Sequence, residues 1–295
     1  MMTATTSIAD SVRAAFPFSV DKLPLCGPEG LRTPHYGLFR SDSGASVGIA
    51  CKKGYEPHTV DDVCALVEAA ADAFGGNAKA RCLFHNGHYV TVEPSAEYRR
   101  SIFGTADNIW PQLILRAGYD GRCFSANLGF YRDACRNLAM IRSQGNAVTA
   151  NIRHTFQLRS KLDELRRTFA RLAAGWNGVV DTALQMEARQ VVLADFLRQV
   201  YPLAADVAER TQRAAERRIE SIVARIVAER QATGRPRLIG TDGAYLVSAW
   251  EAFNGVQGYV QHDMSRHGRP DDYTRAVVAL DDAAVSRALE LALAV

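Results

Sequence analysis

The spacing of apolar residues changes near residue 155, and this change constrains the fold more than any other feature of the chain. Before that point, apolar residues occur in short runs bounded by Gly, Pro, Asn and Asp, a pattern typical of strands and turns. After it, apolar residues recur three and four positions apart, which is the spacing of a helix face. The pattern predicts an α+β fold: a strand-rich antiparallel N-terminal core with packed helices, followed by an all-helical C-terminal region.

This pattern divides the chain into three expected regions. Residues 1–34, which contain a Pro/Gly-rich loop, are expected to form an N-terminal arm. Residues 35–155 would form the α+β core, and residues 156–295 a helical region packed on that core. A chain of 295 residues is long enough for one large domain or two ordinary ones.

Turn sequences mark two hairpins in the first half of the chain. Asn86-Gly87 lies between the strand-like runs 80–84 and 88–93, and Asn-Gly is a preferred pair for a two-residue hairpin turn. Residues 35–51 enclose a second turn sequence, Ser41-Asp42-Ser43-Gly44. Further strands are expected at residues 109–117, 124–130 and 148–153, and a helix or a buried turn at residues 133–141.

Helix signals are clearest after Thr59 and in the second half of the chain. Thr59 can cap a helix whose first turn holds Asp61 and Asp62, where the helix dipole favours acidic side chains. This helix is expected to end at Gly75-Gly76. Helical spacing predicts further helices over residues 156–173, 178–200, 204–232, 244–262 and 281–294.

The sequence gives no sign of a membrane segment or a secretory signal. It has no run of eighteen apolar residues, so we expect no membrane partner. Residues 1–18 lack the apolar block of a signal peptide, and we therefore expect a cytoplasmic protein.

No cofactor or metal motif is recognisable, and we expect neither. The chain contains no P-loop and no Gly-x-Gly-x-x-Gly sequence after a strand. His85 and His88 flank the Asn86-Gly87 turn and are interpreted as a solvated hairpin tip, while His262 and His267 are interpreted as a helix end. No two cysteines are separated by two residues, so the six thiols are interpreted as reduced, mostly core residues: Cys26, Cys51, Cys64, Cys82, Cys123 and Cys135.

Positive charge is concentrated in one stretch of fifty residues. Residues 122–171 hold ten Lys/Arg and three Asp/Glu, whereas the segments on either side each carry a small negative balance within an overall charge of +3. Nine of the ten basic residues are arginine, whose planar guanidinium group suits phosphate. This concentration predicts a nucleic-acid-binding surface.

Basic and aromatic side chains alternate in this stretch. Arginine neutralises phosphate and aromatic rings stack on bases, so together they favour single-stranded DNA as the partner. The competing interpretation is a solvated basic face over ordinary core aromatics. The candidate nucleic-acid-binding residues are Arg122, Phe130, Tyr131, Arg132, Arg136, Arg142, Arg153, His154, Arg159 and Lys161.

Two other functions stay open on the sequence alone. Arg132 and Arg136 flank Cys135, and on a helix they would lower the pKa of its thiol, so an enzyme centred on Cys135 and Asp120 is one alternative. Its mark would be a deep pocket that brings these residues to a histidine such as His154. The other alternative is an interaction or anti-defence protein that acts through an apolar surface on residues 204–262. We assign no catalytic residue.

Three motifs resemble a known family. They are Tyr119-Asp120-Gly121 followed by Phe130-Tyr131-Arg132-Asp133-Ala134-Cys135-Arg136-Asn137, then Ile152-Arg153-His154-Thr155, and finally Trp250-Glu251-Ala252-Phe253-Asn254-Gly255-Val256 with Tyr259-Val260-Gln261-His262. Together they are similar to motifs of the phage/plasmid-like family, domain of unknown function family 932. This chain has Arg122 where many members have Ser, and Tyr119 where they have His.

The resemblance implies a setting on plasmids and prophages and no established enzyme. It is joined by a weaker similarity to single-strand annealing proteins of recombination, which is an analogy of fold. Our first hypothesis is therefore a DNA-binding protein of mobile elements that binds or anneals single strands. A homo-oligomer is a further expectation, because annealing proteins often form rings.

Overall fold

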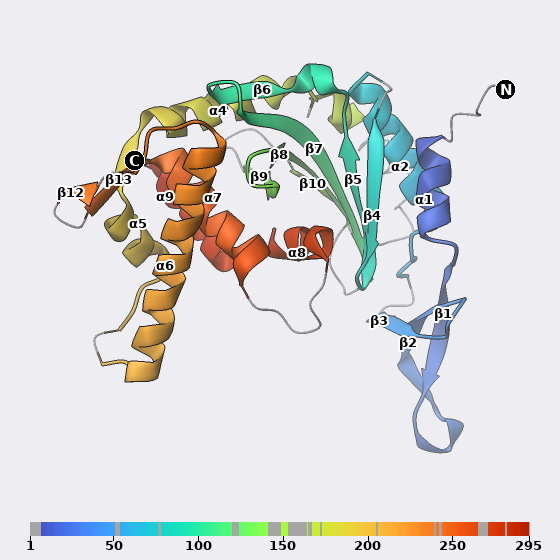
Figure 1. The fold of residues 1–295 in the computed structure, drawn as a ribbon. Helices are drawn as coiled ribbons and strands as arrows, with labels where there is room; N and C mark the ends of the chain where they lie inside the picture. The colour runs from blue at the N-terminus through green and yellow to red at the C-terminus, as the bar shows by residue number, and fades with distance from the viewer. Residues whose placement is uncertain are drawn as a thin grey trace. The chain divides into compact units, whose positions relative to one another are not determined.

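A computed structural model gives the fold of this protein (Figure 1). The fold is mixed α+β, with antiparallel strands in the N-terminal part and helices toward the C-terminus, which confirms the predicted fold class. The structure describes residues 7–50, 54–75, 78–119, 124–140, 149–152, 164, 167–171, 173–204, 206–238, 240–241, 244–264, 271–280 and 282–294.

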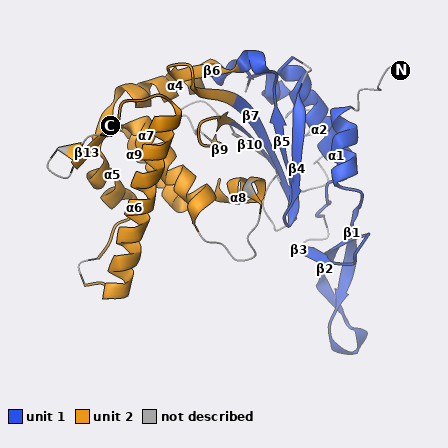
Figure 2. Cartoon of the chain, in the orientation of Figure 1, with its two compact units in different colours: residues 1–98, 111–129, 142–176 blue, residues 99–110, 130–141, 177–295 orange. Residues whose placement is uncertain are grey.

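The contacts divide the chain into two compact units (Figure 2). Unit 1 comprises residues 1–98, 111–129 and 142–176, and unit 2 comprises residues 99–110, 130–141 and 177–295. These units do not follow the three expected regions, because two long strands each contribute residues to both units. Sequence periodicity identifies such strands but does not show where their neighbours lie.

Unit 1 contains a small antiparallel sheet in the order β1 (Val20–Cys26), β2 (Arg32–Arg40) and β3 (Ser46–Ala50). Strands β2 and β3 form the predicted hairpin within residues 35–51, with Tyr36 opposite Ala50. A short 3₁₀ turn, η1 (Pro28–Gly30), lies between β1 and β2.

The larger sheet has seven strands, with β10, β8, β7, β5 and β4 in order and with β6 on β7 and β9 on β8. Asn86 has a positive φ of 50° in the turn between β4 and β5, and Phe84 pairs with His88, so the predicted hairpin is confirmed. The three other predicted strands correspond to β7, β8 and β10. The strands are β4 (Lys79–Phe84), β5 (Gly87–Glu93), β6 (Arg100–Phe103), β7 (Asp107–Gly118), β8 (Phe124–Arg132), β9 (Asn137–Met140) and β10 (Thr149–Ile152).

Two helices of unit 1 contact this sheet. Helix α1 (Ile8–Ala15) packs against α2 (Val60–Ala73) and β4, and α2 also contacts β5. The predicted cap of α2 is confirmed, because the Thr59 hydroxyl accepts from the Asp62 amide at 3.1 Å. The apolar face of α2 is buried, as its helical spacing predicted: Val63, Leu66, Val67 and Ala70.

Unit 2 holds most of the helices, but it is not all-helical. Residues 190–192 form a strand that pairs with residues 246–248 of β13, with Val191 opposite Val247. The helix predicted over residues 178–200 is therefore interrupted by a strand, and the one predicted over residues 244–262 starts only after a strand, since the valines of these strands find partners distant in the sequence. The elements are α4 (Trp176–Ala188), β11 (Gln190–Val192), α5 (Leu193–Val200), α6 (Glu209–Ala232), β12 (Gly240–Thr241), β13 (Ala244–Ser248), α7 (Ala249–Gly258), η3 (Tyr259–Asp263), α8 (Asp272–Ala279) and α9 (Ala283–Ala294).

Helix α7 is the centre of unit 2, and all ten of its residues are buried. It contacts α6, α9 and β9. Gly255 permits close packing with α6, since a Cβ atom there would lie 2.7 Å from Ile226 Cγ1. Residues 133–136 form a turn ahead of β9 in which Cys135 is buried but Asp133 and Arg136 are exposed, so this segment is a turn rather than a helix.

Candidate functional site

A buried network of arginines and carboxylates lies in unit 2. Arg132, at the end of β8, has only 1% of its surface exposed. Its Nε donates to Asp107 Oδ1 at 2.7 Å and its Nη2 to Asp107 Oδ2 at 2.9 Å, the two-pronged geometry that makes arginine–carboxylate pairs strong. Its Nη1 donates to Glu229 Oε2 of α6 at 2.5 Å. The three contacts connect β7, β8 and α6.

A second buried arginine extends the network. Arg235 Nη2 donates to Asp107 Oδ2 at 2.8 Å, and its Nη1 donates to Glu187 of α4. The guanidinium group also lies 4.1 Å from the centre of the Phe103 ring. Burial alone would raise the pKa of Asp107, but the two arginines outweigh that effect and lower it. Asp107 is therefore an ionised carboxylate inside the protein.

The network continues to the start of α7. Arg230 lies 3.3 Å from Glu251, and the Glu251 carboxylate accepts from the backbone N–H of Ser248, which is the residue that caps α7. The Ser248 hydroxyl also donates to Glu187 at 2.8 Å. Glu251 thus both caps a buried helix and balances a buried arginine.

These contacts correct the sequence interpretation of Arg132. We expected it to contact phosphate, but its guanidinium group is buried and held by Asp107 and Glu229. Its partners lie 25 and 97 residues away in the chain, and nothing near Arg132 in the sequence indicates them.

The structure also corrects the role expected for Phe130. Its side chain is fully buried, with the ring centre 5.3 Å from that of Trp250, so it is not available to stack on a base. Tyr131 is half-buried beside Trp110, and Arg136 is exposed with a positive φ of 55°. The other predicted contact residues lie outside the described part of the chain: Arg122, Arg142, Arg153, His154, Arg159 and Lys161.

A pocket of about 760 Å³ opens beside the network. It lies between the turn that follows β8, one face of α6, and η3. Its polar lining includes Cys135, Arg225, Glu229, His262 and Asp263. All of these residues belong to unit 2.

Cys135 lies in this pocket as a neutral thiol. Burial raises the pKa of Cys135 to about 12, and the charge of Glu229 adds to that effect, whereas the nearby Arg132 only partly opposes it. The expectation that flanking arginines lower this pKa is therefore wrong. Cys135 lies in a turn rather than a helix, and Arg132 is already paired with two carboxylates.

The two carboxylate oxygens of Glu229 differ in their hydrogen bonds. Its Oε2 accepts from Arg132, while its Oε1 is buried and accepts no hydrogen bond from the residues that the structure describes. Arg225 Nη1 lies 3.8 Å from Oε1. Arg225 itself is held by Asp263 through contacts of 2.7 and 2.6 Å. Burial raises the pKa of Glu229 in spite of the two arginines.

His262 reaches the pocket from η3, a π-helical turn. Its Nε2 lies 3.2 Å from Asn137 Oδ1, and Asn137 Nδ2 donates to the Asn254 carbonyl at 3.1 Å. π-helical turns inside helices occur frequently at functional sites. The enzyme interpretation required Cys135, Asp120 and a histidine in one pocket. The pocket contains Cys135 and His262, while Asp120 and His154 lie outside the described residues.

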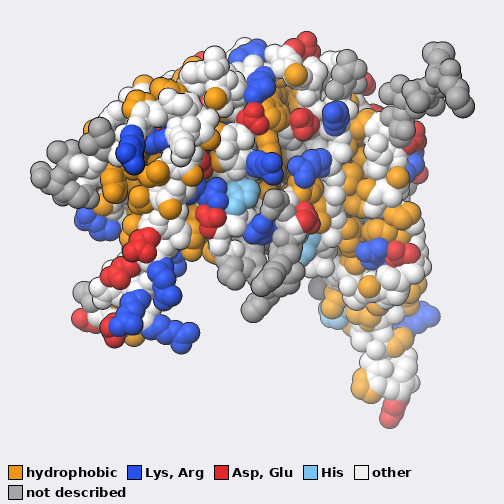
Figure 3. Space-filling view, in the orientation of Figure 1, with side chains coloured by type: hydrophobic (Ala, Val, Ile, Leu, Met, Phe, Trp, Pro, Cys, Tyr) orange, Lys and Arg blue, Asp and Glu red, His pale blue; other side chains and the backbone are white. Residues whose placement is uncertain are grey.

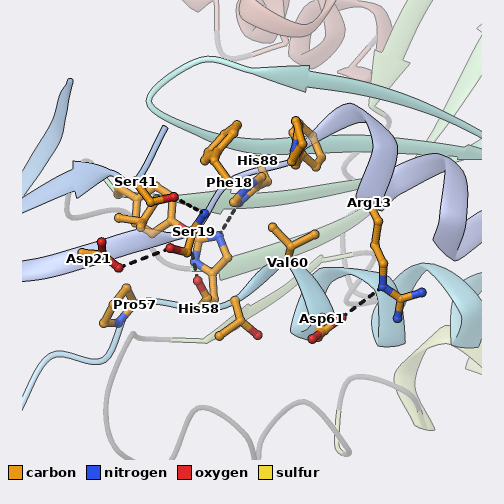
Figure 4. A pocket seen from close by; sticks show the side chains of 15 residues that line it. Arg13, Phe18, Ser19, Asp21, Ser41, Pro57, His58, Val60, Asp61 and His88 are labelled. Atoms are coloured by element: carbon orange, nitrogen blue, oxygen red, sulfur yellow. Dashed lines mark hydrogen bonds and ion pairs between the residues drawn. The ribbon is translucent and has the colours of Figure 1, made fainter. Parts of the chain in front are cut away.

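Unit 1 contains a second pocket, of about 650 Å³, beside two buried histidines (Figure 4). His58 Nε2 and His88 Nδ1 are 2.7 Å apart, and the His58 ring stacks on Tyr119 at 4.4 Å. Burial lowers the pKa of His88 to about 4, and the charge of Arg40 adds to this effect, so His88 is neutral near pH 7. The interpretation of His88 as part of a solvated hairpin tip is therefore wrong. Phe16 and Phe18, from the segment that follows α1, cover it.

The described residues hold neither a metal-binding cluster nor a membrane-spanning helix. No three His, Cys, Asp or Glu side chains among them form a group able to hold a metal ion. None of the helices described here is both long enough and apolar enough to cross a bilayer.

The fold and the two pockets define a mixed α+β protein with a buried arginine–carboxylate network. The chain belongs to the family described as Domain of unknown function (DUF932), whose model matches residues 51–289. No curated protein and no solved structure matches the chain. Two of the motifs that carry the family resemblance contact each other in unit 2, since Phe130 packs on Trp250, and Asn137 bonds to Asn254 and His262.

Proposed function

We propose that the protein binds nucleic acid, with single-stranded DNA as the ligand, through residues 122–171. The concentration of charge in this stretch carries the proposal, because ten basic residues there face only three acidic ones. Phosphate neutralisation by such residues supplies most of the sequence-independent affinity of proteins for nucleic acids.

The described basic residues of this stretch support the proposal in part. Arg136, Arg167 and Arg171 are exposed, and none forms an ion pair with a carboxylate in the described part of the chain. Arg132 is the exception, because Asp107 and Glu229 already balance its charge. An exposed arginine without an acidic partner can bind phosphate without first losing an ion pair.

We extend the proposal to strand annealing in recombination on plasmids and prophages, which is the setting that the phage/plasmid-like resemblance implies. A cytoplasmic homo-oligomer belongs to the same proposal. Of the candidate stacking residues, Tyr131 is half-buried, whereas Phe130 is not accessible. An interaction surface on residues 204–262 stays a prediction.

Fluorescence anisotropy with a labelled single strand tests the proposal. We expect binding at 50 mM salt that weakens steeply as salt rises. The variant R136A/R167A/R171A should bind more weakly and show a salt slope smaller by about two, since each phosphate contact on a single strand contributes about 0.7. If the full-length protein does not bind at 50 mM salt, the proposal is wrong.

The matched control removes three exposed arginines from another surface. Arg210, Arg213 and Arg217 lie on the exposed first half of α6, where basic and acidic side chains gather (Figure 3). The variant R210A/R213A/R217A has the same net charge as the test variant. Equal losses of affinity in the two variants would show that only net charge matters, and that the stretch 122–171 is not the binding surface.

A further inference from the structure

Two aromatic rings lie side by side on neighbouring strands in unit 2. Trp110 is on β7 and Tyr131 is on β8, and these strands are adjacent in the larger sheet. Their ring centres are 5.0 Å apart, and the ring planes differ by 36°. Both residues are partly exposed, whereas Trp176 and Trp250 have 2% and 0% of their surfaces exposed. Trp110 is thus the most accessible of the three tryptophans in the chain.

Exposed arginines lie on the segments that adjoin the two rings. Arg99, whose side chain is 45% exposed, places its guanidinium group 5.5 Å from the centre of the Trp110 ring. Arg100 is exposed at the start of β6, which pairs with β7. Arg136 is exposed in the turn that follows β8, and the Asp133 amide of this turn donates to a β7 carbonyl at 3.0 Å.

The ion pair that holds Arg99 is open to solvent. Asp133 accepts from Arg99 Nη2 at 2.7 Å, and the Asp133 side chain is 49% exposed. Ion pairs between exposed side chains contribute little to stability, so a ligand can displace this one at small cost. Arg99 can then turn from the Trp110 ring to a phosphate group, which leaves the ring for a base.

The charge around the rings favours nucleic acid as the occupant. Arg99, Arg100 and Arg136 face a single carboxylate, that of Asp133, among these residues. Aromatic rings on adjacent strands stack successive bases in sheet-type RNA-binding domains, while arginines bind the phosphates. In a duplex the bases are already stacked on one another, so the rings can reach only the bases of a single strand.

We propose that Trp110 and Tyr131 form a stacking platform for the bases of single-stranded nucleic acid, with Arg99 and Arg136 contacting the phosphates. This inference rests on the proposed function and adds a base-binding subsite to it. Trp110 and Arg99 lie outside the basic stretch of residues 122–171, so the subsite extends the proposed surface beyond that stretch.

The test compares two labelled strands of equal length, oligothymidylate and an abasic strand, each added to the full chain. Both carry the same phosphates, so only the bases distinguish them. In fluorescence anisotropy at 50 mM salt, oligothymidylate should bind about fivefold more tightly or better, since stacking one base on an aromatic ring contributes at least that ratio. Oligothymidylate should also quench tryptophan fluorescence, and the abasic strand should quench it much less.

The outcomes separate this platform from the proposed function on which it rests. Equal binding of the two strands, with unchanged tryptophan fluorescence, would overturn the platform and leave nucleic-acid binding in place. If neither strand binds, both proposals are wrong. This comparison uses the original protein, so it does not depend on whether a variant folds.

Variants assign the effect to the two rings. Trp110→Leu and Tyr131→Leu should each weaken binding of oligothymidylate by about fivefold or more and leave binding of the abasic strand unchanged. Trp110→Phe keeps a ring, so it should retain most of the affinity but lose the quenching. The matched control is Tyr36→Leu, which removes a partly exposed ring with Lys22 Nζ 4.5 Å from its centre and should bind normally.

Circular dichroism must first show that each variant is folded. If the leucine variants lose affinity for both strands equally, the rings only support the fold and the platform is wrong.

A contact between copies of the chain is the competing role for these residues, because Trp, Tyr and Arg also dominate protein interfaces. Light scattering distinguishes the two. If Trp110→Leu changes the oligomeric state but keeps the preference for oligothymidylate over the abasic strand, the rings form an interface between copies and the proposal is overturned.

Discussion

Arg132 Nη1 donates a hydrogen bond to Glu229 Oε2, and this contact joins the end of β8 to α6 across 97 residues of sequence. The same guanidinium group holds Asp107 through its two other nitrogens. One arginine therefore connects three elements of unit 2, while Arg136, four residues later, is exposed. The basic stretch thus contains both a structural arginine and arginines that face water.

This difference predicts a large loss of stability for one substitution and almost none for its neighbour. Arg132→Ala leaves Asp107 and Glu229 without a partner inside the protein, and it should lower the free energy of unfolding by about 3–5 kcal/mol. Arg136→Ala removes an exposed side chain and should change the free energy by less than about 0.5 kcal/mol. Urea denaturation of both variants measures these values. An Arg132→Ala variant of full stability with lost DNA affinity would instead make Arg132 a phosphate contact.

The two arginines also show what the sequence can and cannot predict. The Asn86-Gly87 hairpin and the Thr59 cap were predicted because they depend on residues adjacent in the chain. The pairing of Arg132 with Glu229 and of His58 with His88 depends on distant residues, so the sequence alone indicates a solvent-facing position for Arg132 and for His88. A buried pair of charges is also rare enough that an exposed arginine is the better expectation from sequence.

The strands at residues 190–192 and 244–248 were missed for a related reason. Each is short and adjoins a helix with a strong apolar pattern, so the local signal favours one long helix. The pairing of Val191 with Val247 decides the outcome, and that contact has no local signature. The pocket beside Cys135 was likewise not predictable, since its wall comes from α6 and its rim from η3.

The histidine pair makes stability depend on pH. The pKa of His88 is about 4 in the folded protein against an ordinary value of 6.5, so the unfolded chain takes up the proton first. Stability from the neutral side chain is complete above pH 6.5 and is lost as pH falls toward 4. The full loss is about 3 kcal/mol, since each pKa unit corresponds to about 1.4 kcal/mol.

The substitution His88→Gln should remove most of this pH dependence, because an amide can still bond to His58 but does not titrate. Urea midpoints at pH 7 and pH 5 measure the effect. His35→Gln, on the exposed side of β2, is the control and should keep the slope of the original protein. If His88→Gln keeps the difference in urea midpoint between pH 7 and pH 5, the pH dependence of stability comes from other groups.

Cys135 should react slowly with thiol reagents in spite of its two arginine neighbours. Its pKa of about 12 leaves almost no thiolate at pH 7.5, and its side chain is buried. N-ethylmaleimide should therefore modify the exposed Cys26 first, and the two sites should react at similar rates in concentrated urea. Fast modification of Cys135 in the folded protein would support the enzyme interpretation.

Two glycines in helices of unit 2 should respond in opposite directions to the same change. A Cβ atom at Gly255 would lie 2.7 Å from Ile226 Cγ1, so Gly255→Ala must displace α7 from α6 and should cost about 1–3 kcal/mol of the free energy of unfolding. Gly178 is exposed on α4 and meets no atom within 4 Å, so Gly178→Ala should add about 0.5–1 kcal/mol through helix propensity. Thermal or urea unfolding of the pair measures the difference. If both variants gained stability, α6 and α7 would not pack as closely as the structure has them, and the position of α6 in the wall of the pocket beside Glu229 would be wrong.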